Sequence, residues 1–247
     1  MVGSFVFCIQ TMERLSLHPP LAERVYAAIR DAICSGELPP GARLTQEQLA
    51  ARLDVSRQPV LQALILLKKQ GFVREVGRRG VVVAPLDPVF VAQLYEVRAA
   101  LDGLACRAAA ARRPDEARRH GPALIEAGRA AVRSGSVAQM VEADIRFHQF
   151  LYELSGNPLI AETAALHWLH IRRVMGGYLQ RDRARDDIWD EHAAILGAVA
   201  DGAAERAERL AREHAETSAR KLTGALAAEH APQHDLREDA QKGRNAR

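Results

Sequence analysis

The stretch ADIRFHQFLYELSGNP, residues 143 to 158, places a carboxylate and an imidazole four residues apart, at Asp144 and His148. On a helix this spacing puts both side chains on one face, one turn apart. Such a pair can hold a metal ion, act as a catalytic acid and base, or remain solvated. The surrounding Phe, Leu and Ile residues favour a helix, but the pair alone does not choose among these three roles.

The elements around this pair are predicted to be helical. Residues 88 to about 227 are rich in Ala, Leu and Arg with helical periodicity, and breaks at RRPD, RSGS, SGNP and DG divide them into about six helices. This pattern predicts a helical bundle. From Glu229 to Arg247 the chain is polar and nearly free of large apolar residues, which predicts a disordered tail.

The front of the chain has a different pattern. Val25, Ile29 and Ile33 predict a helix that ends at SGELPPG, and Thr45 and Ser56 are expected to cap two further helices. The runs FVREV and VVVAP, joined by GRRG, predict a β-hairpin with a basic tip. With a boundary at APLDP, the predicted divisions are a flexible extension (1–15), a first domain (16–86), a helical domain (87–228) and a tail (229–247).

The composition narrows the class of protein. Residues 1 to 86 carry 11 Lys and Arg against 7 Asp and Glu, whereas the rest is balanced, so a polyanionic partner is expected at the front. The three cysteines form no metal or disulfide motif, and the run FVFCI is too short for a membrane span and lacks preceding cations. We therefore expect a cytoplasmic protein without membrane contact, whose start is either Met1 or Met12.

The string LTQEQLAARLDVSRQPVLQALILLKKQGFV has a helix-turn-helix layout, in which the second helix enters the major groove of DNA. Arg57 is placed to bind guanine in a bidentate way, while residues at the hairpin tip are expected to reach the DNA backbone or the minor groove. The expected DNA-binding residues are Arg43, Thr45, Ser56, Arg57, Gln58, Gln62, Arg78 and Arg79.

This front region resembles the GntR-type winged-helix transcription regulators, through GELPPGARLTQEQLA, VSRQPV and the wing GFVREVGRRGVVV. The resemblance covers roughly residues 21 to 86. It departs from the family at Leu61 and Gln62, where Arg-Glu is usual, at Asp54, where Gly is common, and at Gln46, where an acidic residue is common. The family's operator therefore cannot be transferred to this chain.

The helical region resembles the ligand-sensing domain of the FadR-like (FCD) branch, through YEVRAALDGLACRAAA, ADIRFHQFLYELSGNPLI, DEHAAILGAV and AREHAETS. The resemblance implies a divalent metal ion at the positions that match the branch's ligand pattern. These positions are Asp144, His148, His192 and His214. Periodicity supports this set, because each position shares a helical stripe with apolar residues. His167 and His170 are the rival donors.

Three imidazoles and one carboxylate suit zinc first, with nickel, iron or manganese as alternatives. Positions left open on a six-coordinate ion would accept an oxygen of a small organic acid. The resemblance places an effector-contacting Arg at Arg98, whose stripe turns the guanidinium inward, where it would need an anion. The alternative is an exposed pair with Asp102, worth about 0.3–0.5 kcal/mol. Asn157 is assigned to helix capping or turn formation rather than to ligand binding.

The predicted fold is mainly α: a winged helix-turn-helix domain of three helices and a hairpin, followed by an all-α ligand-sensing bundle. The predicted function is a metabolite-responsive regulator, not an enzyme, that binds a palindromic double-stranded operator as a homodimer. One alternative is a metal-free sensor of a larger acyl ligand. Another alternative is a metal-dependent enzyme. It lacks support because no acidic catalytic base is expected beside the metal: Glu142 and Glu191 adjoin ligand positions but, as immediate neighbours on a helix, are expected to point elsewhere.

Overall fold

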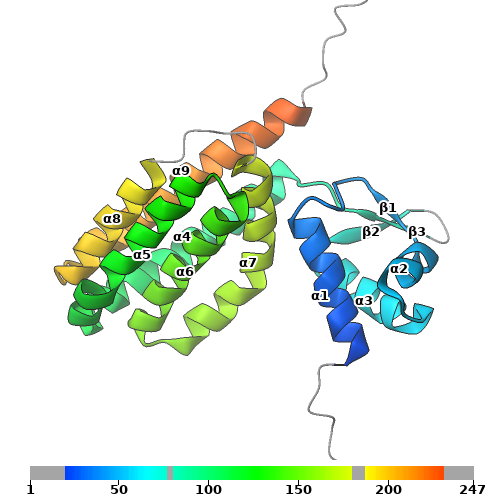
Figure 1. Cartoon of the computed structure of the whole chain (residues 1–247). Coiled ribbons are helices and arrows are strands. Elements are labelled where there is room, and N and C mark those ends of the chain that lie inside the picture. Colours follow the sequence, from blue (N-terminus) through cyan, green and yellow to red (C-terminus); the bar gives the residue numbers. More distant parts are fainter. Residues whose placement is uncertain (1–19, 77–79, 180–186, 231–247) are drawn as a thin grey trace, which may run out of the picture. The chain divides into compact units, whose positions relative to one another are not determined.

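The computed structural model describes residues 20–76, 80–179 and 187–230 (Figure 1). The chain divides into two compact units, one of residues 1–33 and 41–84 and the other of residues 34–40 and 85–247. The predicted extension 1–15 lies outside the described residues. So does the predicted tail, apart from residues 229 and 230, which are the last two of a helix.

The first unit is a winged helix. It contains α1 (Leu21–Cys34), β1 (Arg43–Leu44), α2 (Gln46–Leu53), α3 (Arg57–Lys69), β2 (Val73–Val76) and β3 (Gly80–Val83). The helices pack through apolar positions spaced three or four apart, such as Val25, Ile29 and Ile33 of α1, all of which are buried. Phe72 and Val83 are fully buried and join the sheet to this core.

The sheet has three strands in the order β1-β3-β2, rather than the two strands of the predicted hairpin. Both pairings are antiparallel, with Val73 opposite Val83 and Arg43 opposite Val82. No strand was predicted from the sequence at Arg43–Leu44, because a two-residue strand is too short to show alternation in sequence. Its backbone pairing with β3 is a tertiary contact.

Residues at the helix ends define where the two helices of the helix-turn-helix begin and end. Thr45 caps α2 as predicted, because its side chain accepts a hydrogen bond from the Gln48 amide at 3.2 Å. Ser56 stands at the N-cap of α3 but makes no side-chain capping bond. Asp54 ends α2 with φ 51°, in the left-handed region that glycine adopts without strain.

The second unit is a bundle of helices. They are α4 (Pro88–Arg112), α5 (Pro114–Ser134), α6 (Val137–Ser155), α7 (Pro158–Leu179), α8 (Asp187–Ala200) and α9 (Ala204–His230). The four predicted breaks coincide with helix ends, since Gly135 and Gly156 adopt positive φ and prolines begin α5 and α7. The break between α7 and α8 falls in residues 180–186, outside the described residues.

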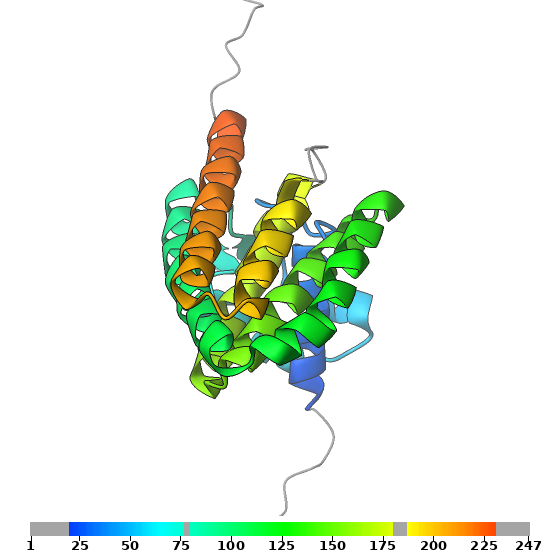
Figure 2. The same ribbon diagram turned by 90° about the vertical axis from the view of Figure 1, so that its left-hand side faces the viewer.

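Helix α4 lies along the bundle and packs most extensively against α9 and then α6 (Figure 2). Two buried clusters fill the interior, one around Trp168 and Ile171 of α7 and the other around Phe147 of α6 and Trp189 of α8. The predicted mainly α fold is therefore confirmed. None of the described helices has the length and apolarity that a membrane span requires.

Candidate metal centre and nucleic-acid interface

Four buried side chains from three helices converge inside the bundle. Asp144 and His148 lie on α6, His192 on α8 and His214 on α9, and one ligand atom from each lies within 4.8 Å of all the others. All four residues are at most 3% exposed. Among the described residues they form the single group of three or more His, Cys, Asp or Glu side chains with metal-ligand spacing.

The distances within the group are those of donors that face a common point. The Nε2 atoms of His192 and His214 are 3.2 Å apart, and His192 Nε2 is 3.5 Å from Asp144 Oδ1. Donors bound tetrahedrally to one ion at 2.0–2.2 Å stand about 3.3–3.6 Å apart, so a pair separated by as much as 4.8 Å must close by about 1–1.5 Å to share an ion.

Unpaired polar atoms support the same interpretation. Asp144 Oδ2 and His192 Nδ1 are buried and have no hydrogen-bond partner among the described residues. Leaving a buried polar atom unpaired costs free energy, and coordination of a cation by Asp144 would remove that cost for its carboxylate. The donor types, burial and spacing therefore fit a divalent ion.

Two further carboxylates contact the outer nitrogens of the histidine rings. Glu191 accepts a hydrogen bond from His214 Nδ1 at 2.7 Å, which leaves the Nε2 lone pair of that ring facing the group. Asp102 Oδ2 lies 3.3 Å from His148 Nδ1, close but not aligned as a hydrogen bond, and Asp102 also accepts a hydrogen bond from the Tyr152 hydroxyl. Such contacts set the tautomer and orientation of metal-binding histidines.

The guanidinium of Arg98 lies beside the donors. Its Nη2 is 2.6 Å from His148 Nε2 and 3.6 Å from Asp144 Oδ2, its Nε donates to Asp102 at 3.2 Å, and its Nη1 donates to the Tyr95 hydroxyl at 3.3 Å. The alternative pairing of Arg98 with Asp102 is therefore present, but both residues are at most 3% exposed, so the expectation that this pair is exposed was wrong. Two protein carboxylates supply the anions that this buried cation needs.

Burial controls the ionisation of the group. It lowers the pKa of His192 well below its usual value, and the neighbouring His214, His148 and Arg98 lower it further. Burial and Arg98 also lower the pKa of His148. Burial tends to raise the pKa of Asp102, but His148, Arg98 and the Tyr152 hydrogen bond outweigh it and hold that pKa below its usual range. At neutral pH the two imidazoles are therefore neutral and have a lone pair for a metal ion.

The rival donors lie apart from this group. His167 and His170 are half-buried on α7, and within the described part of the chain neither belongs to a cluster with metal-ligand spacing. The His170 ring instead packs edge-on against Phe90, with centroids 5.0 Å apart. Asn157 accepts a hydrogen bond from the Leu159 amide at 3.2 Å at the start of α7, which confirms its capping role.

Sequence reasoning missed the outer carboxylates. The expectation that Glu191 points away from the ligands was wrong, because its side chain is long enough to reach His214 on the neighbouring helix. Helical periodicity could have found Asp102, since Arg98, Asp102, Ala105 and Ala109 recur at helical spacing and are all buried.

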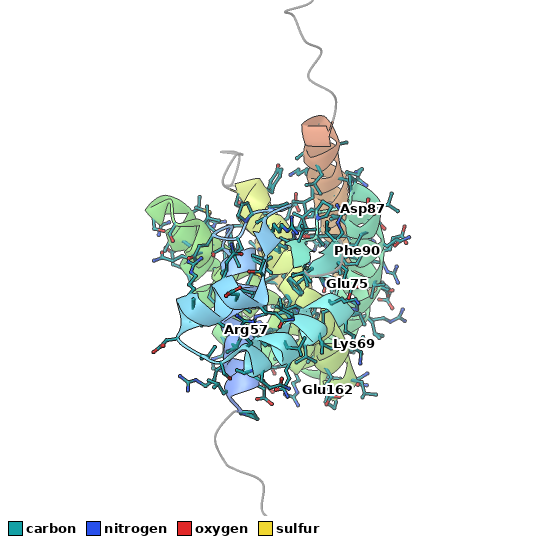
Figure 3. All side chains as sticks on the ribbon, turned by 90° about the vertical axis from the view of Figure 1, so that its right-hand side faces the viewer. Arg57, Lys69, Glu75, Asp87, Phe90 and Glu162 are labelled. Carbon is teal, nitrogen blue, oxygen red and sulfur yellow. The ribbon has the colours of Figure 1, made fainter. Side chains whose placement is uncertain are left out.

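In the first unit, the expected DNA-contacting residues at the start of α3 are exposed. Arg57, Gln58 and Gln62 are exposed on α3, with Arg57 at the N-terminal end of the helix and Lys69 at its C-terminal end (Figure 3). The Nη2 of Arg57 donates to Glu47 of α2 at 3.0 Å, a pair exposed enough to contribute at most about 1 kcal/mol.

The remaining residues that were expected to contact DNA differ in their exposure. Arg43 is exposed on β1 and Ser56 is exposed at the start of α3, whereas the Thr45 hydroxyl is engaged in capping. Arg78 and Arg79 lie outside the described residues. Leu61 and Ile65 add an exposed apolar strip to α3, 36% and 57% exposed, beside a surface hollow of about 910 Å³.

Comparison with known proteins agrees with this architecture. Residues 21–83 match the gntR family of bacterial regulatory proteins, and residues 93–217 match the FCD domain. A helix-turn-helix-type transcriptional regulator of Streptomyces ambofaciens is 30% identical over 77% of this chain and 80% of its own length. A regulator of the same type from Agrobacterium vitis is 35% identical over 51% of this chain and 75% of its own.

A solved structure shares the fold. A GntR regulator of Rhodococcus is 26% identical, has a TM-score of 0.68, and covers 83% of this chain and 98% of its own. The chain is thus a helix-turn-helix transcription regulator. It belongs to the GntR family and carries a C-terminal FCD domain. Membership of a family of transcription regulators argues against an enzymatic function for this chain.

Proposed function

We propose that this regulator binds a two-fold operator as a dimer and senses a small organic acid at a divalent metal ion held by the bundle. The observation that carries the proposal is the convergence of four buried donors, from three helices, within 4.8 Å of one another. Zinc suits this donor set best, with nickel, iron and manganese as alternatives. When bound, the ion would supply a Lewis-acidic centre with positions open to a ligand oxygen.

The protein residues have distinct roles in this proposal. Asp144, His148, His192 and His214 hold the ion, while Asp102 and Glu191 orient the His148 and His214 rings. Arg98 occupies the lone pair of His148 Nε2, so metal binding requires its guanidinium to turn away from that atom. Once released from that atom, the guanidinium is available to pair with the carboxylate of an effector.

The effect of an effector on operator binding follows from thermodynamic linkage between the two binding equilibria. An effector changes operator affinity only if it binds the DNA-bound and DNA-free arrangements unequally. The experiment is therefore a pair of calorimetric titrations of the metal-loaded protein with candidate organic acids, with and without an operator fragment selected from random DNA. The proposal expects two different dissociation constants for the active acid. Equal constants would remove the sensing mechanism.

Metal analysis separates this proposal from a metal-free sensor. Elemental analysis of the wild-type protein should give one divalent ion per chain, and His192→Ala should lose it. His170→Ala is the matched control, because it removes a histidine from the same domain outside the group. A wild-type protein that retains no metal after loading, together with a co-purified acyl ligand, would instead favour the metal-free alternative.

A further inference from the structure

Two aliphatic side chains stand near the centre of the exposed face of α3. Leu61 and Ile65 are 36% and 57% exposed, and both line the surface hollow beside this helix. At about 100° per residue they lie roughly 40° and 80° around the helix from Arg57, with Gln62 farther on at about 140°. These two residues, here called the apolar strip, are therefore flanked by polar residues on both sides. An apolar strip within a polar surface favours a partner that covers it.

Ion pairs stand before and after the apolar strip along the helix. Arg57 Nη2 donates to Glu47 at 3.0 Å, and Lys68 Nζ donates to Glu75 at 2.6 Å. All four of these residues line the same hollow, and their side chains are at least half exposed. Exposed pairs of this kind are weak, so the phosphates of a nucleic acid can replace the two carboxylates. The partner that fits is therefore anionic at its edges and apolar between them.

Double-stranded DNA has this combination. Phosphates border the major groove on both sides, and thymine presents a methyl group, on C5, within the groove. Helix α3 is the second helix of a helix-turn-helix in the region that matches the gntR family, residues 21–83, and such helices enter the major groove. Leu61 follows Arg57 by about 6 Å along the helix, which is close to two base-pair steps of about 3.4 Å. Leu61 is thus within reach of bases near the one that Arg57 contacts.

We infer that Leu61 selects thymine at one position of each operator half-site, through contact with the C5 methyl group. The thymine lies about two base pairs from the guanine that Arg57 is proposed to read. Ile65, one turn further along α3, shields the contact from water. This inference rests on the operator binding of the proposed function. It adds a specificity-determining residue that reads a base without a hydrogen bond.

The first test is selection from random double-stranded DNA with the full chain. The wild-type protein is expected to prefer thymine at the position described above. Leu61→Ala should lose this preference and keep the guanine preference assigned to Arg57. Leu66→Ala is the matched control, because it truncates another exposed leucine of α3, 42% exposed, that is not among the described residues lining the hollow. The control should keep both preferences.

The second test changes the DNA alone. Replacing the selected thymine with uracil removes the C5 methyl group and keeps the base pair. The wild-type dissociation constant, measured by fluorescence anisotropy at one fixed salt concentration, should rise about fourfold for each methyl group removed. Leu61→Ala should bind the thymine and uracil duplexes equally. If Leu61→Ala does not fold by circular dichroism, the wild-type protein decides the question, because uracil at other thymines should have no such effect.

Three results would overturn the inference. They are equal wild-type binding of the two duplexes, the same loss with uracil in Leu61→Ala as in the wild type, and an unchanged thymine preference in folded Leu61→Ala. The last result would assign the apolar strip to a protein partner instead. A wild-type protein that selects no sequence would remove operator binding from the proposed function and this inference with it. Selection of a sequence with equal binding of the two duplexes would overturn this inference alone.

Discussion

At the scale of single residues, Arg98 and a bound metal ion compete for the same lone pair. The guanidinium lies 2.6 Å from His148 Nε2, so it both blocks the donor and repels a divalent cation. Arg98→Gln is therefore expected to bind metal at least about tenfold more tightly, which corresponds to about 1.4 kcal/mol. The measurement is a competition titration against a chelator. Arg146→Gln, which removes an exposed charge from α6, should change little.

Weaker metal binding by Arg98→Gln would show that the guanidinium supports the site through Asp102 rather than opposing the ion. The same variant should lose its response to organic acids, because its side chain no longer carries the charge that pairs with a carboxylate.

Glu191 is expected to act through His214. Replacing it with Ala removes the acceptor of the His214 Nδ1 proton, so metal affinity should fall by about 10–100-fold. Glu191→Gln keeps an acceptor oxygen and should lose less. Isothermal titration with zinc measures both variants, and equal losses for Gln and Ala would contradict the orienting role.

Arg57 is expected to read a base at the start of α3. Losing one bidentate contact to guanine should weaken specific binding by about 1–3 kcal/mol and relax preference at one operator position. Selection from random DNA with the wild-type protein and Arg57→Ala tests this expectation. An unchanged preferred sequence would assign Arg57 to the phosphate backbone instead.

At the scale of elements, the position of α8 depends on its close packing against α5. A side chain built at Gly128 would lie 2.0 Å from the Trp189 ring, so the two helices touch through a residue without a Cβ. Gly128→Ala should therefore destabilise the protein by about 1–3 kcal/mol in urea unfolding, although alanine favours helix. Gly224→Ala, which meets nothing within 4 Å, should instead be neutral or stabilising. Equal effects would mean that α5 and α8 are not in firm contact.

The reactivity of the Cys106 thiol measures how well the buried face of α4 is shielded from solvent. Burial, reinforced by Asp102, raises its pKa well above the usual value. At pH 8.5, where an ordinary thiol is about half ionised, Cys106 should remain protonated and resist iodoacetamide. Mass spectrometry of tryptic peptides should find it unmodified in the native protein and alkylated in urea. Rapid native alkylation would mean that the bundle opens readily along α4.

The elements show what a single sequence can predict. The helix breaks were correct because glycine at positive φ and proline at the first turn are local signals, as at Gly135 and Pro158. The strand at Arg43 was missed because it exists only through pairing with β3. The convergence of the four donors was anticipated from the family resemblance and their apolar stripes. The Glu191 contact depends on the distance between two helices, which no periodicity reveals.

At the scale of the whole molecule, a winged-helix unit of the GntR family and a helical FCD domain are joined in one chain. The basic surplus lies in the first, and the buried donors lie in the second. The central claim is that those four donors share one ion. Anomalous diffraction at the absorption edge of the loaded metal tests it most directly. We expect one strong peak about 2.0–2.2 Å from Asp144 and from three Nε2 atoms. A peak elsewhere, or none among these side chains, would contradict the claim.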